Sequence, residues 1–358
     1  MTATRPARTQ GKVRAARLTD LAALGELSRL CQSDGAATRS LGLPVSGPPI
    51  GVFSLFRLPL GAFRPNDLMY VYEHEGRIAG LVRVERESTR DEWTIVELDA
   101  VGMSDAGDIR YRLVQQLLRE GAKRGAARFH VACADMDGNI EMLMQAGFIR
   151  YGEEQILFRP ARSSLPSPWT EEAAAEARIR PVQPADALAI HRLYSAATPA
   201  PVARLESIRL PDWERQGTHS RVPRSSLAPI LRFADVEAFV QLAVDGGKDG
   251  TELDGFVQIG VAKEDQPHYL KLLARPDADA SDLVSFGLGI IAARTVKGSD
   301  HRGDHGVIAA VRTYESPTDR RLSEVGFKKV STVTLLMKET LVRVAEPALV
   351  PAGVRSAR

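Results

Sequence analysis

Val13-Arg-Ala-Ala-Arg-Leu-Thr-Asp20-Leu-Ala-Ala-Leu24 and Ile179-Arg-Pro-Val-Gln-Pro-Ala-Asp186-Ala-Leu-Ala-Ile190 are two versions of one pattern, 166 residues apart. Each version predicts a short strand, a capped turn and a helix. In the first, Thr19 and Asp20 precede an apolar-periodic run and can accept hydrogen bonds from free N–H groups at the helix start. The pattern therefore indicates that one structural unit begins twice.

A second signal recurs further along each copy. Gly147-Phe148 and Gly326-Phe327 both follow a short helical pattern, and they lie 179 residues apart. Two signals that recur in the same order at similar offsets indicate a tandem duplication with modest insertions. The length of 358 residues is enough for two domains, each with its own core.

Hydrophobic patterns between these signals predict the same elements in both copies. In the first copy they predict a hairpin around Glu75-Gly76, a strand over 93–101, a helix over 108–124, a strand over 128–133, a short helix to Gln145 and two closing strands. In the second they predict a hairpin over 236–261, a strand over 268–273, a helix over 282–296, a strand over 306–311, a helix over 317–324 and closing strands. We expect an α/β chain of two domains, each with its own mixed, mostly antiparallel sheet flanked by helices.

Composition along the chain sets the expected domain limits. Residues 159–168 have the Pro and Ser density of a linker, and 171–177 favour a helical turn or two. We expect a flexible N-terminus at 1–11, an N-terminal domain at 12–160, a linker at 161–176, a C-terminal domain at 177–342 and a tail at 343–358. Pro and Arg recur over 199–232, where His219-Ser-Arg-Val-Pro-Arg-Ser-Ser226 predicts an exposed loop over one mouth of the second domain. This loop either shapes a substrate site or is a variable insertion.

Overall composition excludes several classes of protein. Hydrophobic residues make up 44% and charged residues 26%, as in ordinary soluble domains. The net charge of +2 gives no global field that would attract nucleic acid or an anionic membrane. The N-terminus lacks a secretory signal, and no window is apolar enough to span a bilayer. Cys31 and Cys133 are interpreted as buried hydrophobes, so we expect a cytoplasmic protein and leave a homo-oligomer open.

The predicted order, β-α-β-β-β-α-β-α-β-β, resembles the GNAT acetyltransferase superfamily. The opening Thr19-Asp20 and the closing Gln145-Ala-Gly-Phe148 carry this resemblance, and Glu324-Val-Gly-Phe327 repeats the close. It covers nearly the whole chain except the ends, the linker and the insertions. It implies a tandem pair of GNAT-like domains, each sheet splayed between its fourth and fifth strands. It also implies acetyl-CoA or another acyl-CoA as cofactor, and a small-molecule amine or a peptide as acceptor.

The resemblance implies that the pyrophosphate of coenzyme A lies at the helix after the fourth strand, where N–H groups and the helix dipole favour an anion. The cofactor contacts that it implies in the first copy are Val101, Met103, Gly107, Arg110 and Arg112. The two arginines could pair with phosphate. Only Gly107 remains of the usual glycines, and Asp105 and Asp108 either repel phosphate or cap the helix.

The same turn in the second copy is less suited to the cofactor. It reads Arg275-Pro-Asp-Ala-Asp-Ala-Ser-Asp282, with three carboxylates and no glycine. We therefore expect any activity in the N-terminal domain. At the position of the family's thiolate-protonating tyrosine, the two copies have Leu143 and Leu322, so both acid positions are apolar. Tyr111, Tyr151 and Tyr314 are either substitutes for this acid or amphipathic residues at a sheet or helix margin.

Acetyl transfer to an amine also needs a base. Glu97 and Asp99 are two apart on the predicted fourth strand, so their side chains share one face. If that face lines the cleft, one of them is the base; a solvated strand face is the equal alternative. The matching residues of the second copy, Lys271 and Leu273, include no base.

The remaining signals are weaker. His301-Arg-Gly-Asp-His305 does not supply a full ligand set, so we expect no metal site. Arg215, His219, Arg221 and Arg224 are interpreted as a solvated loop, because they lack the interleaved aromatics of a nucleic-acid surface. Two functions stay open: an acyl-CoA-dependent N-acyltransferase, or a non-catalytic binding or scaffold protein that has lost coenzyme A binding.

Overall fold

The computed structural model describes residues 11–33, 67–87, 91–101, 106–135, 138–160, 169–214, 222, 224–229, 231, 233–244, 252–262, 266–297 and 306–340. The flexible N-terminus predicted at 1–11, except Gly11, and the tail predicted at 343–358 lie outside these ranges.

The first half begins with strand β1 (Lys12–Ala15), the 3-10 turn η1 (Leu18–Asp20) and helix α1 (Leu21–Ser33). Its other elements are β2 (Asp67–His74), β3 (Arg77–Glu87), β4 (Glu92–Ala100), α4 (Ala106–Lys123), β5 (Arg128–Cys133), α5 (Asn139–Gln145) and β6 (Ile149–Arg159). The predicted hairpin joins β2 and β3 through Glu75 and Gly76, with φ of 50° and 76°. Such positive φ angles are what a two-residue hairpin turn requires.

The second half follows helix α6 (Glu171–Glu176), which lies in the predicted linker. Its elements are β7 (Ile179–Pro181), η2 (Pro184–Asp186), α7 (Ala187–Ala197), α8 (Ala200–Glu206), α9 (Leu210–Glu214), β8 (Phe233–Leu242), β9 (Leu253–Ala262), β10 (His268–Ala274), α10 (Ser281–Lys297), β11 (Val307–Arg312), α11 (Ser316–Glu324) and β12 (Lys328–Glu339). Apart from α8 and α9, this order repeats the first half. The predicted α/β class, with helices flanking mostly antiparallel strands, is confirmed.

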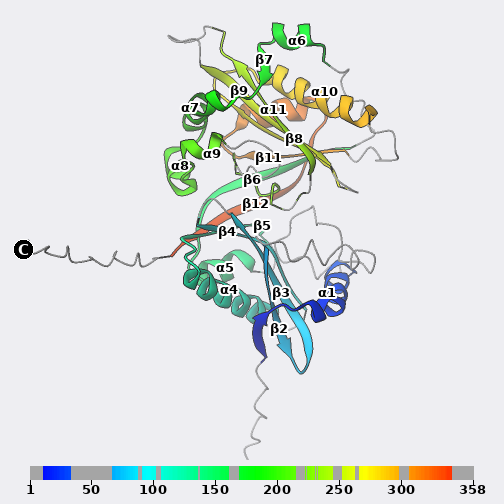
Figure 1. Ribbon diagram of the computed structural model, residues 1–358, viewed down its shortest axis with the longest axis vertical. Helices are drawn as coiled ribbons and strands as arrows, with labels where there is room; N and C mark the ends of the chain where they lie inside the picture. The colour runs from blue at the N-terminus through cyan, green and yellow to red at the C-terminus, as the bar shows by residue number, and fades with distance from the viewer. Residues whose placement is uncertain are drawn as a thin grey trace, which may run out of the picture.

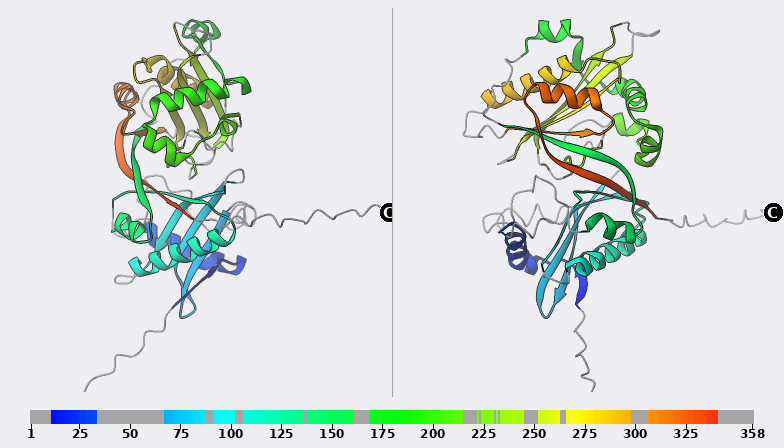
Figure 2. Two further views of the ribbon diagram at one scale, coloured as in Figure 1. Left: turned by 90° about the vertical axis from the view of Figure 1, so that its left-hand side faces the viewer. Right: turned by 180° about the vertical axis from the view of Figure 1, so that it is seen from behind.

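The strands of both halves join in one sheet. Within the described residues, twelve strands follow the order β1-β2-β3-β4-β5-β12-β6-β11-β10-β9-β8-β7. Figures 1 and 2 show β6 and β12 as two long strands that cross between the halves. Strand β12, the last of the second half, pairs with both β5 and β6, and β6 pairs in turn with β11.

The prediction that each half closes its own sheet with two strands is therefore wrong. Each half supplies one closing strand and takes the other from its neighbour. Each half has a single closing strand, β6 or β12, and in the shared sheet both edges of each of these strands are paired. The sequence agrees in retrospect, since a single long strand, Ile149–Arg159, separates α5 from the linker.

The predicted splay between the fourth and fifth strands is confirmed in both halves. Parallel pairing of β4 with β5 runs only from Glu92 to Ile95, although β4 continues to Ala100. Val96 forms a bulge there, because the β3–β4 register skips it. In the second half, pairing of β10 with β11 stops at Leu270, four residues before β10 ends.

The repeated opening motif is held by the same contacts in both halves. Arg14 donates two hydrogen bonds to Asp20 at 2.6 and 2.9 Å, and Arg180 donates two to Asp186, both at 2.7 Å. Each carboxylate also accepts the backbone N–H of the residue three positions earlier, at 2.7 Å. We predicted that Asp20 accepts from N–H groups of the helix ahead of it. Instead it closes the 3-10 turn behind it, because its side chain is drawn toward Arg14.

The repeated Gly-Phe signal also has one structure. Gly147 and Gly326 have φ of 88° and 94°, the left-handed conformation that ends a helix. The N–H of the following Phe148 and Phe327 donates to a carbonyl of the last helical turn, at 3.0 and 3.1 Å. Both phenylalanines are buried in the cores of their halves.

Helices cover both faces of the sheet (Figure 2). On one face, α4 and α5 pack on the first half and α10 and α11 on the second. The other face carries α1 in the first half and α7 in the second. We call residues 222, 224–229 and 231 the interdomain segment. It lies at the middle of that second face, where Leu227 and Leu231 pack against strands of both halves. The exposed loop predicted over 219–226 is thus wrong for its described residues, 222 and 224–226, because they are buried or half-buried.

Candidate functional site

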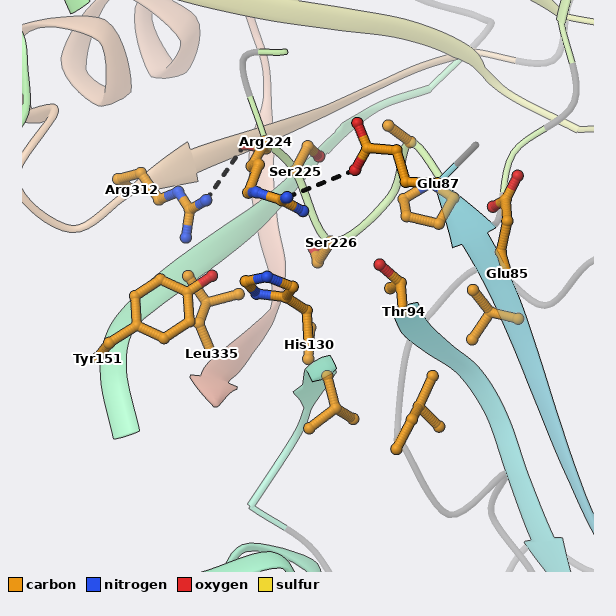
Figure 3. A pocket seen from close by; sticks show the side chains of 16 residues that line it. Glu85, Glu87, Thr94, His130, Tyr151, Arg224, Ser225, Ser226, Arg312 and Leu335 are labelled. Carbon is orange, nitrogen blue, oxygen red and sulfur yellow. Dashed lines mark hydrogen bonds and ion pairs between the residues drawn. The ribbon is translucent and has the colours of Figure 1, made fainter. Parts of the chain in front are cut away.

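A cavity of about 50 Å³ lies where β4 and β5 separate. Figure 3 shows that β3, β4 and β5 of the first half, β6 and the interdomain segment contribute its walls. Its polar lining includes Glu85, Glu87, Thr94, His130, Tyr151 and Arg224. This volume holds a few water molecules or one small polar group, by the usual measure of about 10–15 Å³ per water. The cavity thus marks a confined polar place at the apex of the splay.

His130 is placed in this cavity by strand alternation. Its neighbours Phe129 and Val131 face the first core, so His130 points to the opposite face. Its side chain is 6% exposed, and Nε2 lies 3.3 Å from Oε2 of Glu92. The ring meets Tyr151 edge to face, with centroids 6.5 Å apart. A buried imidazole beside a buried carboxylate is an arrangement suited to accepting and holding a proton.

Arg224 reaches the same place from the second half. Its side chain forms ion pairs with Glu92 and, at 3.4 Å, with Glu87. Figure 3 shows the pair with Glu87. Arg128 also lies 3.5 Å from Glu92, so this carboxylate has two cationic partners. The interpretation of Arg224 as part of a solvated loop is wrong, because the buried Glu92 and the half-buried Glu87 bind it. The other three residues of that basic run lie outside the described part of the chain.

A second buried ionic cluster adjoins the cavity. Arg312 on β11 donates to Glu206 at 2.7 Å and lies 3.4 Å from Glu154. It also donates to the carbonyl of Arg224, at 3.2 Å. Burial alone would lower the Arg312 pKa, but the surrounding carboxylates outweigh burial and raise it. The guanidinium is therefore permanently charged and ties the interdomain segment to β11.

Burial raises the pKa of the tyrosines around this cluster. For Tyr151, desolvation is the largest cause, and Glu206 adds to it. The hydroxyl of Tyr194 donates to Glu206 at 2.7 Å, and burial raises the pKa of this hydroxyl too. These hydroxyl groups are therefore neutral donors at ordinary pH.

Glu97 and Asp99, the predicted bases, lie on the face that α1 covers. Asp99 is directly opposite Leu81, which packs in the α1 cluster, and Glu97 is opposite Arg83. Glu97 forms an ion pair with Arg83 at 2.9 Å, and Asp99 is 2% exposed. The alternative of a solvated strand face is thus wrong. Neither Glu97 nor Asp99 is among the described residues that line the cavity. Their role as bases stays a prediction.

The predicted cofactor contacts of the first half differ in accessibility. Met103 and Asp105 lie outside the described residues. The N–H of Val101 donates to β3, at the carbonyl of Ala79. Gly107 is exposed at the start of α4, with no atom within 4 Å of where a Cβ would stand. Among the described residues, none occupies the space beside Gly107, where an anion could approach the helix start.

The two predicted arginines are engaged within the protein. Arg112 donates to Asp108 on the same helix at 2.6 Å. Arg110 is buried, on the side of α4 that packs on the sheet. A phosphate group would have to compete with Asp108 for Arg112, so these side chains fit coenzyme A only in part.

In the second half, side chains fill the splay. Lys271 on β10 is 1% exposed, and its Nζ donates to the carbonyl of Ala310 on β11 at 3.1 Å. It also pairs with Glu315 at 3.3 Å, and Glu315 accepts the N–H of Arg312. These contacts join the two strands just beyond their last paired residues. A strand-like ligand therefore does not fit between β10 and β11.

The start of α10 is also engaged. Asp279 accepts hydrogen bonds from the backbone N–H and the hydroxyl of Ser281, at 3.0 and 2.7 Å. Arg321 lies 3.1 Å from the same carboxylate. Because an acidic side chain already binds the helix start, this half does not fit a pyrophosphate.

Other residues singled out in the sequence have structural places. Leu143 and Leu322, at the tyrosine positions, are fully buried in the two cores. Cys31 and Cys133 are buried as predicted, and burial raises the pKa of the Cys133 thiol to about 12. Residues 301–305 lie outside the described ranges. Among the residues within those ranges, no three His, Cys, Asp or Glu side chains gather as a metal would need.

Sequence reasoning missed His130, Glu92 and the inward role of Arg224. One signal was available: a histidine between Phe129 and Val131 in a strand whose other face is apolar. Nothing in the pattern pairs it with residues of distant segments.

No helix in the described part of the chain has the length and apolar character needed to cross a bilayer.

Solved structures share this architecture. No protein-family model matches the sequence. No curated protein matches it either. A tandem GNAT protein from the clavulanic acid biosynthesis pathway is 12% identical, with a TM-score of 0.54, over 92% of this chain and 98% of that one. A GCN5-related N-acetyltransferase from Sphaerobacter thermophilus is 16% identical, with a TM-score of 0.51, over 94% and 97%. The chain thus has the tandem GNAT fold.

Proposed function

We propose that the protein is an acyl-CoA-dependent N-acyltransferase, that its first half binds the acyl-CoA, and that the acceptor is an amine. One observation carries the proposal. After Ile95, no described strand pairs with the β5 side of β4, whereas Lys271 and Glu315 fill the equivalent place in the second half. Only the first splay leaves room for a ligand between the strands.

The residues of the first half suit an acyl-CoA in two respects. The pantetheine arm of an acyl-CoA carries amide groups, which can form hydrogen bonds along a strand edge as an extended peptide does. Its pyrophosphate suits the start of α4, where Gly107 is exposed and the helix dipole favours an anion. Bound there, acyl-CoA supplies an activated acyl group at the apex of the splay, beside the cavity.

The polar lining of the cavity suits an amine acceptor. Glu85 and Glu87 line it on β3, and Arg224 and Arg312, which also line it, balance their charges. The two carboxylates can accept hydrogen bonds from the N–H groups of an amine. The related N-acetyltransferase fold supports acyl transfer as the reaction, because structures of this architecture bear that name.

A calorimetric titration with acetyl-CoA tests the proposal. The wild type is expected to bind one molecule per chain. Gly107→Glu adds a carboxylate at an exposed helix start, where it suits the helix dipole but repels phosphate. Affinity is expected to fall about tenfold or more, because one charge-assisted phosphate contact is worth about 1.5–3 kcal/mol. The matched control, Asp282→Gly at the second residue of α10, leaves binding unchanged.

The second candidate is a non-catalytic scaffold protein. The Arg112–Asp108 pair at the α4 start and the filled splay of the second half favour it. If the wild type binds neither acetyl-CoA nor free coenzyme A, the enzyme proposal fails and the scaffold stands. If it binds, thiol release with a panel of amines, polyamines, aminoglycosides and peptides identifies the acceptor.

A further inference from the structure

From the cavity geometry we infer that His130 is the general base of the first half and that Glu92 positions it. The inference rests on the proposed function and deepens it. His130 stands opposite Thr94, one residue before the last parallel pair, Ile95 with Val131. It is therefore the imidazole beside the apex of the splay, on the face away from α4.

The location is what a base requires. A thioester held along β4 beyond the bulge at Val96 would end at this apex, and Val96 itself lines the cavity. An amine entering the cavity would then lie between His130 and the thioester carbon. A base must come within hydrogen-bond reach of the proton that it removes, and the small volume of the cavity enforces that closeness.

Charged and titratable groups face His130 from every element around it. They are Glu92 on β4, Glu85 and Glu87 on β3, Arg128 on β5, Tyr151 on β6, Arg312 on β11 and Arg224 in the interdomain segment. Glu92 lies nearest and stabilises the imidazolium, and the arginines oppose this effect. Arg224 and Arg128 hold the Glu92 carboxylate in place. Glu92 is thus a positioning residue and does not itself touch the acceptor.

The two carboxylates predicted as bases fit this place less well. Glu97 is committed to Arg83 at 2.9 Å, which stabilises its charged form and weakens it as a base. Asp99 lies two residues further from the apex and is buried against the α1 face. His130 instead combines a place in the cavity with an orienting carboxylate.

The reaction balances with these groups. His130 takes one proton from the acceptor ammonium. The neutral amine attacks the thioester carbonyl carbon, so that a C–N bond forms and the C–S bond breaks. The nitrogen's second proton goes to the departing thiolate, giving coenzyme A as the thiol. The imidazolium, stabilised by Glu92, then returns its proton to solvent.

Nitrogen-15 NMR of histidine-labelled protein tests the placement without an acceptor. Acetyl-CoA is expected to shift the imidazole signals of His130, identified by their loss in His130→Gln. Signals of His74, at the far end of β2 and identified with His74→Gln, serve as the matched control and stay unchanged. If calorimetry shows acetyl-CoA binding while the His130 signals do not move, the inference falls and the proposed function stands.

Turnover with the first active amine of the panel tests the role. His130→Gln is expected to bind acetyl-CoA as the wild type does and to lose about 10² to 10⁴ in rate. Rate should fall as pH falls in the wild type, because a protonated imidazole cannot accept a proton. Glu92→Gln removes the charge that favours the imidazolium, so this acid limb moves to lower pH.

The pH–rate profile is measured with two acceptors whose amines differ in pKa. An acid limb that arises from the acceptor shifts with the pKa of the amine, whereas one that arises from His130 stays at the same pH. A wild-type profile with no fixed acid limb overturns the inference even if His130→Gln fails to fold. So does a folded His130→Gln that keeps its rate. Absence of acetyl-CoA binding in the wild type overturns the proposed function and, with it, this role.

Discussion

Arg224 of the second half and Glu92 of the first form an ion pair in which the two side chains are only 10% and 5% exposed. The pair joins the interdomain segment to the start of β4, beside His130. Because β6 and β12 also cross between the halves, the second half is built into the wall of the first half's cavity. The two halves therefore share one sheet and have two unequal clefts.

Arg224→Met is expected to destabilise the whole chain. It leaves the buried Glu92 and the half-buried Glu87 with less compensating charge, and breaking one side of a buried pair typically costs about 3–5 kcal/mol. Urea unfolding measures the loss. The double variant Arg224→Met with Glu92→Met should lose less than the single one. Arg320→Met, which breaks an exposed helix pair, is the control and should unfold like the wild type. Equal stability of all these variants would contradict a buried pair.

Cutting the chain in the linker is expected to leave two fragments that do not fold separately. Residues 1–165 lack β12, which pairs with both β5 and β6, and residues 166–358 lack β6, which lies between β12 and β11. Each fragment would expose long unpaired strand edges, which favour aggregation. Size-exclusion chromatography and circular dichroism check this, and mixing the fragments should restore one folded species. A monomeric fragment with its own cooperative transition would disprove the shared sheet.

Lys271→Met is expected to destabilise the protein without changing acetyl-CoA binding. It removes the cation that pairs with Glu315, whose side chain is 8% exposed. The double variant with Glu315→Gln should recover part of the loss, because the uncompensated buried charge is then gone. Thermal unfolding measures stability, and calorimetry measures stoichiometry. Two acetyl-CoA molecules per wild-type chain would show that the second cleft is open after all.

The fold was largely predictable because its signals are local. Strand and helix periods, the Arg–Asp opening motif and the left-handed Gly before a buried Phe all act within a few residues. The strand exchange was not predictable, because alternation says which residues are buried but not which edge a strand joins. The site was missed for a similar reason: Arg224 and Glu92 are 132 residues apart. No local pattern links the loop of one half to the fourth strand of the other.

The two opening motifs are expected to make stability depend on acidity. The hydrogen bonds from Arg14 lower the pKa of Asp20 below 3.8. For Asp186, burial alone would raise the pKa, but the hydrogen bonds from Arg180 and a backbone N–H outweigh burial and lower it below 3.8.

A folded-state pKa below the unfolded value means that the stabilisation is fully present above about pH 3.8. It is lost as pH falls further through the folded-state values. The variant Asp20→Asn with Asp186→Asn should therefore be less stable than the wild type at pH 7, by about 1.5–3 kcal/mol for each motif. The difference should shrink below about pH 3.8 and vanish once the wild-type carboxyls are protonated. Urea unfolding from pH 7 to pH 2 checks this, with the exposed Asp282→Asn as the control. A difference that stays constant across this range would mean that the carboxylate charges do not stabilise the motifs.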